Sequence, residues 1–269
     1  MIRLMLRARP PTRLSFRGLI PERLAGLSAD SIARQALRQG NRVGVIGDCF
    51  SVDLAGGAED RLVISGAGDC LDDVGAEMSR GELVVEGDAG ARVGLEMSGG
   101  RIVIEGSVGF GAGMAMRGGE LRIRGNAGDD VGGALPGERE GMRNGMLVVE
   151  GSAGAGVGDR MRLGLIVVRG SVGAFCGARM SAGTIIVGGG IGEGAGAAMR
   201  RGTVIAPRGN LRTLPGFADS GAHDLTVLRL LGRALAVHGL SEVASGFFDL
   251  RRWQGDVAVG GKGEIWTPP

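Results

Sequence analysis

The hydrophobic residues in the central part of the chain recur in a unit of 19 residues. Copies of the unit begin at Leu62, Leu83, Ile102, Leu121, Leu147, Ile166 and Ile185. The first copy holds two extra residues, and about seven more, around LPGEREG (135–141), are inserted before Met142. The stretch from Val43 resembles a degenerate earlier copy. Internal repetition of this kind predicts an architecture in which each copy packs against the next.

Each position of the unit has its own character. Positions one and three are Leu, Ile or Val around a variable residue, which is the alternation of a half-buried strand. Positions seven and eleven hold small apolar residues, position fifteen is methionine, and positions five, twelve and eighteen are glycine. The apolar positions therefore predict a narrow interior, and the glycines predict tight corners with positive φ.

A 19-residue unit cannot bury its own apolar side, so the copies must stack with strand on equivalent strand. This predicts an all-β fold, a right-handed parallel β-helix of seven to eight coils. We expect an N-terminal α/β cap segment over residues 1–42, the repeats over 43–205, and a helix and tail over 206–269.

The segments that flank the repeats have helical patterns. LSADSIARQALRQG predicts a helix with Ser28 as its N-cap and Gly40 just past its end. Residues 222–239 have the spacing of an amphipathic helix. Four aromatic residues near the C-terminus form either the core of a cap or a docking patch: Phe247, Phe248, Trp253 and Trp266. Caps of this kind protect the open ends of a repeat stack.

Stacking turns repeat positions into ladders of side chains. The fourth position alternates in sign from Glu105 to Arg169, so neighbouring charges should pair. The sixteenth position and its neighbours are rich in arginine, and the candidate binding residues are Arg143, Arg160, Arg162, Arg179 and Arg200. Stacked arginines repel one another unless an anion lies along them. The anion would come from a partner subunit or a polyanionic ligand, and a solvated surface is the alternative.

Composition excludes several classes of protein. Glycine supplies 55 of the 269 residues, too many for an ordinary domain, while 43% hydrophobic residues are too many for a disordered chain. A net charge of +2 indicates no attraction to nucleic acid. Three widely spaced cysteines indicate neither a disulfide framework nor a metal site. Without a stretch typical of a signal peptide or membrane span, a cytoplasmic protein that does not enter membranes is expected.

A search for catalytic motifs finds no convergent set. The sequence contains no GxGxxG, P-loop or GxSxG motif. Capping or packing roles are expected for His223 and His238, and Cys176 occupies an interior position of the repeat. The acidic pairs at 72–73 and 129–130 suit a cation or a solvated turn. The residues therefore predict a scaffold with no catalytic residue and no metal or cofactor bound by this chain alone.

Several motifs, in a specific order, resemble the C subunit of the formylmethanofuran dehydrogenase family. They include LAGLSADSIARQ, GDCFSV, GNAGDDVG, GMRNG, MSAGTIIV, MRRGTVI, LPGF and GGKGEIW, which together span nearly the whole chain. The repeats alone are also similar to the C-terminal β-helix domain of the glutamate synthase large subunit. The flanking segments favour the first family, and the single lysine, Lys262, favours its bacterial branch, the formyltransferase/hydrolase complexes of methylotrophs.

The resemblance implies a non-catalytic structural subunit. In the bacterial complex, formyl groups pass from tetrahydromethanopterin to a methanofuran or methylofuran carrier, and a metal-dependent amidohydrolase-like subunit releases formate. Formyltransferase and dehydrogenase-like subunits are the other implied partners. The five arginines would guide the glutamate-rich tail of the carrier or seat an acidic subunit. The alternatives are the C subunit of a molybdenum or tungsten formylmethanofuran dehydrogenase, or a glutamate synthase-type scaffold domain of an amidotransferase.

Overall fold

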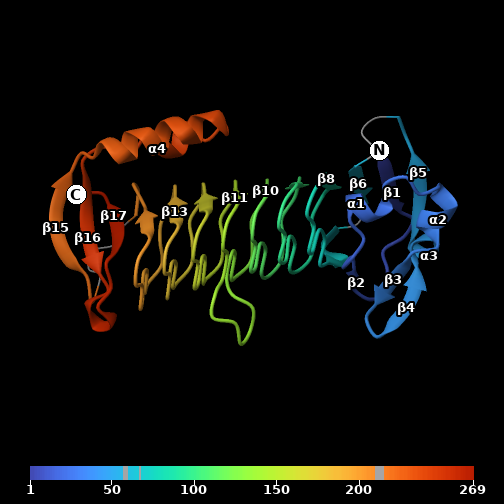
Figure 1. The fold of residues 1–269 in the computed structure, drawn as a ribbon, viewed down its shortest axis with the longest axis horizontal. Coiled ribbons are helices and arrows are strands. Elements are labelled where there is room, and N and C mark those ends of the chain that lie inside the picture. Colours follow the sequence, from blue (N-terminus) through green and yellow to red (C-terminus); the bar gives the residue numbers. More distant parts are fainter. Residues whose placement is uncertain (57–59, 67, 210–214) are drawn as a thin grey trace.

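A computed structural model describes residues 1–56, 60–66, 68–209 and 215–269. It consists of an elongated stack of strands between two end regions, with the N-terminus at one end and the C-terminus at the other (Figure 1). Leu214 of the LPGF motif lies outside the described residues.

The copies of the repeat form the middle of a 13-stranded sheet. Their strands are parallel and successive: β6 (Arg61–Ser65), β8 (Glu82–Glu86), β9 (Arg101–Ile104), β10 (Glu120–Ile123), β11 (Met146–Val149), β12 (Leu165–Val168), β13 (Thr184–Val187) and β14 (Thr203–Ile205). Leu83 pairs with Ile102, which pairs with Leu121, so position one meets position one in the next copy. Leu121 pairs with Leu147 across the insertion. The prediction that equivalent positions stack is confirmed.

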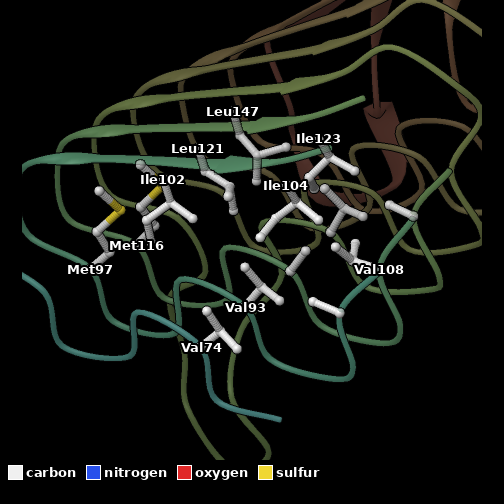
Figure 2. Packing of buried hydrophobic residues seen from close by; sticks show 14 of the residues in the cluster. Val74, Val93, Met97, Ile102, Ile104, Val108, Met116, Leu121, Ile123 and Leu147 are labelled. Atoms are coloured by element: carbon white, nitrogen blue, oxygen red, sulfur yellow. The ribbon is translucent and has the colours of Figure 1, made fainter. Parts of the chain in front are cut away.

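The interior of the stack holds the side chains that the pattern selects. Positions one, three, seven, eleven and fifteen converge on one continuous hydrophobic cluster (Figure 2). The methionines of position fifteen, such as Met97 and Met116, are fully buried. Each large apolar side chain buried in this way contributes about 1.5–3 kcal/mol relative to an exposed one.

The predicted fold class, an all-β right-handed parallel β-helix, is wrong. The structure is mixed α/β: one 13-stranded sheet, a separate four-stranded sheet and helices at both ends, with no closed barrel in the described part of the chain. The reason lies in the second half of each repeat. There, copies meet through isolated single-residue bridges such as Ala89 to Val108, because residues with positive φ, such as Arg92 and Gly111, follow closely and end the extended backbone.

A side-chain ladder crosses these turns at position six. The side-chain oxygens of Asp88, Ser107, Asn126, Ser152 and Ser171 each accept a hydrogen bond from the backbone N–H of the equivalent residue in the next copy, at 2.7–3.1 Å. Each copy therefore satisfies one backbone donor of its successor where no strand pairing is present.

The N-terminal region completes one end of the stack. β1 (Ile2–Leu6) pairs in parallel with β6 and antiparallel with β5 (Phe50–Leu54), which is an edge of the large sheet. The stretch from Val43 is therefore not a first copy of the repeat, since β1 takes that place. The four-stranded sheet joins β4 (Arg42–Val45), β3 (Ala36–Gln39), β2 (Leu14–Ser15) and β7 (Leu71–Asp72).

The helices of this region are short: α1 (Pro21–Leu24), α2 (Ala29–Ala33) and α3 (Ile46–Cys49). Ser28 is the N-cap of α2, accepting a hydrogen bond from the Ser31 N–H at 3.2 Å, as predicted. The predicted end of this helix at Gly40 is wrong. Residues 36–39 instead form β3, because Gly40 and Asn41 turn the chain into a hairpin with β4.

The C-terminal region completes the other end. β17 (Gly263–Thr267) adds to β14 in parallel, and β16 (Leu250–Gly255) and β15 (Ala218–His223) follow antiparallel. The predicted amphipathic helix is present as α4 (Thr226–Val237), which α5 (Ser241–Ala244) follows. Two 3-10 turns lie at Gly68–Cys70 and Val257–Val259.

Helix α4 lies along the outer face of the large sheet (Figure 1). Leu228 and Leu235 pack with the second-position residues of the sheet, such as Val148 and Val167. Trp266 and Phe247 belong to the same buried cluster, while Phe248 is exposed. Trp253 is partly buried against the interior cluster of the stack, so Phe248 alone of the four predicted aromatic residues points away from the core.

The end of α4 meets a buried arginine. Arg122 takes the second position of its copy, between Val103 and Val148, and is 9% exposed. Its Nη2 donates to the carbonyl oxygen of His238 at 3.0 Å, and its guanidinium pairs with Glu150 at 3.3 Å and Glu120 at 3.4 Å. A cation at the carbonyl end of a helix is favourable, so Arg122 stabilises this end of α4 against the sheet.

Candidate functional site

Two of the predicted arginines share one carboxylate from the insertion. Glu140 pairs with Arg143 at 3.1 Å and forms a short contact with Arg162. The insertion projects from the turns on the side away from the large sheet (Figure 1). Its Leu135 packs on an apolar cluster with Leu95 and Met114, which are at position thirteen in earlier copies. The insertion therefore brings an acidic group of this chain to the arginines.

Two further predicted arginines share a second carboxylate. Arg179 donates to both oxygens of Asp159 at 2.8 and 2.7 Å, and Arg160 lies 3.7 Å from the same group. The hydrogen bond that Arg179 donates to Asp159 is the largest cause that raises the pKa of Arg179. Arg160 also donates to the Glu138 carbonyl oxygen at 2.7 Å. The Asp159 side chain is only 14% exposed, which favours a persistent pair.

Arg200 is separate from these two pairs. It is exposed, and within the described ranges neither an ion pair nor a side-chain hydrogen bond reaches it. The sequence pattern placed all five arginines on one surface but did not reveal Glu138, Glu140 and Asp159 as their partners. The acidic residues of the insertion were the sequence feature from which such partners could have been inferred. The face is thus a mixed arginine and carboxylate surface.

A pocket of about 440 Å³ lies beside Asp159 and Arg179. Its floor and walls come from four copies of the repeat and are lined by Asp130, Ala155, Gly156, Asp159, Phe175, Ala178, Arg179, Ala197 and Ala198. Burial is the main cause that raises the pKa of Asp130, and the charges of Asp159 and Asp129 raise it further. This pocket is the place where the mixed surface becomes concave and apolar.

The fourth-position ladder pairs as predicted. Arg124 lies 3.7 Å from Glu105 and 2.7 Å from Glu150, and Glu150 lies 3.3 Å from Arg169. Arg169 also donates to the Gly239 carbonyl oxygen at 3.1 Å and pairs with Glu242 of α5 at 2.6 Å. The ladder therefore links the sheet to the C-terminal helices.

The remaining candidate residues take structural positions. Cys176 is fully buried, and burial raises its pKa to about 12, so it is not poised as a nucleophile. His223 Nε2 lies 2.9 Å from the Ser220 carbonyl oxygen, and its ring lies beside Trp266. Asp73 pairs with Arg92 at 2.7 Å. Asp129 accepts from the Ala155 N–H at 2.7 Å.

Metal-ligating side chains do not gather in the described part of the chain: it includes no group of three or more His, Cys, Asp or Glu residues that could hold a metal ion. None of the helices described there combines the length and apolar character needed to span a bilayer.

A repeat stack closed at both ends, with an ionic surface along its side, defines a class of protein that presents extended faces to other molecules. A crystal structure of the formyltransferase/hydrolase complex FhcABCD from Methylorubrum extorquens, in complex with methylofuran, contains a similar chain. The two share 41% identity and a TM-score of 0.92, and the match covers 99% of each chain.

A curated relative is the C subunit of the formyltransferase/hydrolase complex Fhc of Methylorubrum extorquens, which is 42% identical over 84 residues. That alignment covers 31% of this chain and 31% of the relative. No family model matches the chain. The chain belongs to the family of C subunits of formyltransferase/hydrolase complexes, which confirms the family indicated by the sequence motifs.

Proposed function

We propose that this chain is the structural and assembly subunit of a complex that transfers formyl groups from formyl-tetrahydromethanopterin to a furan-type carrier and hydrolyses them to formate. The observation that carries the proposal is 41% identity over 99% of a chain from such a complex. This match favours the formyltransferase/hydrolase branch over a molybdenum or tungsten dehydrogenase and over a glutamate synthase scaffold. In the described part of the chain, Cys49 and Cys176 form no disulfide, which agrees with a cytoplasmic location.

The catalytic groups and the metal belong, in this proposal, to the amidohydrolase-like, formyltransferase and dehydrogenase-like partners. Expression of those partners with and without this chain tests it. We expect the purified chain to lack formyl transfer and hydrolysis, and the partners to assemble poorly without it. Formyl transfer or hydrolysis by the isolated chain would refute a purely structural role.

The proposed role of the arginine surface is to guide a polyanionic carrier tail or to seat an acidic subunit. Arg143, Arg160, Arg162 and Arg179 already contact Glu140 or Asp159, so an incoming carboxylate would exchange with these internal partners. Arg200 needs no such exchange.

Replacing these four arginines and Arg200 with serine tests the role, with Arg42→Ser as a control at an exposed arginine of the N-terminal end. Carrier affinity and complex assembly are measured separately. A drop in carrier affinity alone supports the tail, and a drop in assembly alone supports contact with an acidic subunit. If neither quantity changes relative to Arg42→Ser, the surface has no binding role.

A further inference from the structure

The carboxylate of Asp130 lines the 440 Å³ pocket together with Arg179, and burial raises the pKa of Asp130 more than the charge of Arg179 lowers it. Among the residues that the structure describes, no hydrogen bond or ion pair reaches its side-chain oxygens, although it is only partly exposed. The neighbouring Asp159 is different, since Arg179 holds it through both oxygens. A partly desolvated carboxylate without an ion-pair partner is unfavourable, and a cation that pairs with Asp130 would remove this cost.

An earlier copy of the repeat has an aspartate with a cationic partner at the same position. Asp73 and Asp130 both occupy position ten, with φ of 59° and 57°. In the copy that follows Asp73, position ten is Arg92, whose Nε and Nη2 donate to the two oxygens of Asp73 at 2.7 and 3.2 Å. In the copy that follows Asp130, position ten is Gly156. Asp73 therefore shows how a guanidinium binds an aspartate at this position.

The glycine at position 156 allows the carboxylate of Asp130 to pack closely against the backbone of the next copy. A Cβ on Gly156 would collide with Asp130 Oδ1. The next copy thus supplies no cation at this position, and the open space beside Asp130 is that of the pocket it lines.

The rest of the pocket suits an apolar stem. Ala155, Ala178, Ala197 and Ala198 line it with small methyl groups. The ring of Phe175 forms one wall and is 55% exposed, so part of its apolar surface is open to a bound group. Aliphatic stems of arginine and aromatic rings pack on such surfaces, and a ring face also attracts a cation.

We propose that this pocket binds one guanidinium or ammonium group carried on an apolar stem, with Asp130 as its ion-pair partner and Phe175 as its apolar wall. The cationic group is the side chain of an arginine of a neighbouring subunit. This assignment of its source rests on the proposed function. A free cationic molecule of the same chemistry is the other source, and probe binding before and after assembly separates the two.

Binding to the full-length isolated chain tests the pocket independently of the complex. The probes are N-benzylguanidine, which is cationic, and N-benzylurea, its neutral isostere, titrated by NMR at pH 7. We expect N-benzylguanidine to bind at least about tenfold more tightly, since a charge-assisted bidentate pair is stronger than a neutral one. Equal affinity of the two probes, or no binding of either, would overturn the proposal.

Two variants and a matched control locate the site. Asp130→Asn keeps the shape and tolerates positive φ, and it should weaken N-benzylguanidine by about tenfold. Phe175→Ala should also weaken the probe, and alanine is accepted at positive φ elsewhere in this chain, as at Ala198. Phe110→Ala removes a comparably exposed ring, 44% exposed, that does not line the pocket, and should have no effect. Unchanged binding by Asp130→Asn would refute the pairing.

Folding of the Asp130→Asn variant has its own expected result. Since burial raises the pKa of Asp130, its ionised form opposes folding, and stability is lost as the pH rises through that pKa. The variant should therefore be at least as stable as the natural chain at pH 7, and a melting curve checks this. A loss of binding with an intact melting curve supports the site, whereas a loss of both would assign Asp130 to the fold.

The assembled complex identifies the source of the cation. If a neighbouring subunit fills the pocket, N-benzylguanidine will no longer bind after assembly, and Asp130→Asn will weaken assembly. Unchanged probe binding in the complex would overturn a neighbouring subunit as the source. A chain that binds the probe but never assembles with partners would refute the proposed function and leave the pocket intact.

Discussion

Replacement of Arg122 by methionine should release the end of helix α4 from the sheet. Methionine keeps an unbranched apolar stem but removes the hydrogen bond to the His238 carbonyl oxygen at 3.0 Å. A hydrogen bond that involves a charged group contributes about 1.5–3 kcal/mol. Glu150 keeps Arg124 at 2.7 Å, so it is not left unpaired and adds little to the loss.

Hydrogen exchange measures this local effect. A loss of about 2 kcal/mol corresponds to exchange about 30-fold faster in the last turn of α4, with unchanged exchange in the strands of the repeats. Arg101→Met is the control, because Arg101 is half exposed and lies 3.9 Å from Glu120, a contact that contributes about 1 kcal/mol or less. Equal exchange in the two variants, or an unchanged α4 in Arg122→Met, would refute the assignment.

Three further results follow from the interior and the turns. Met116→Ala should lower the free energy of unfolding by about 2–5 kcal/mol in urea, because Met116 is fully buried, and a loss below about 1 kcal/mol would contradict the packing. By the same measurement, Gly113→Ala should lower the free energy of unfolding clearly more than Gly137→Ala. Both glycines have positive φ, but only at Gly113 would the new Cβ collide with another side chain, that of Leu147. Burial opposes ionisation of Asp72, yet hydrogen bonds from Arg13 and a backbone N–H outweigh it and lower its pKa below 3.8. Its stabilising effect should therefore be present above about pH 4 and disappear as the pH falls further, and a melting temperature of Asp72→Asn as acid-sensitive as that of the natural chain would argue against this.

The interior of the stack could be predicted because the information is local. Position fifteen recurs as methionine and position eleven as a small apolar residue, so Met97 and Cys176 could be assigned to the interior from spacing alone. Helix α4 followed from its amphipathic pattern for the same reason.

The fold class could not be predicted in this way, because it depends on which segments pair. Period and glycine content do not distinguish a second sheet from a series of single bridges. Whether β1 or the stretch from Val43 lies beside β6 is decided by contacts between distant segments. Local propensity also misassigned residues 36–39, where pairing with β4 overrides helical character.

Of the charged groups at the candidate site, the sequence predicted the arginines but not the carboxylates that pair with them. The repeat placed the arginines on one surface, but the carboxylates that meet them come partly from the insertion, which has no equivalent in other copies. Arg122 lies at position two, which the sequence suggested to be variable, and only the structure reveals that it is buried between Val103 and Val148 and bonded to the end of α4.

Because the register is uninterrupted across the repeats, the length of the stack can change only in steps of one copy. Removing or duplicating one 19-residue copy would leave every ladder in phase and move the C-terminal end by one strand spacing, about 4.8 Å. The insertion before Met142 adds chain without adding such a step, since Leu121 still pairs with Leu147. The number of copies therefore determines the distance between two partner molecules that bind at opposite ends of the stack.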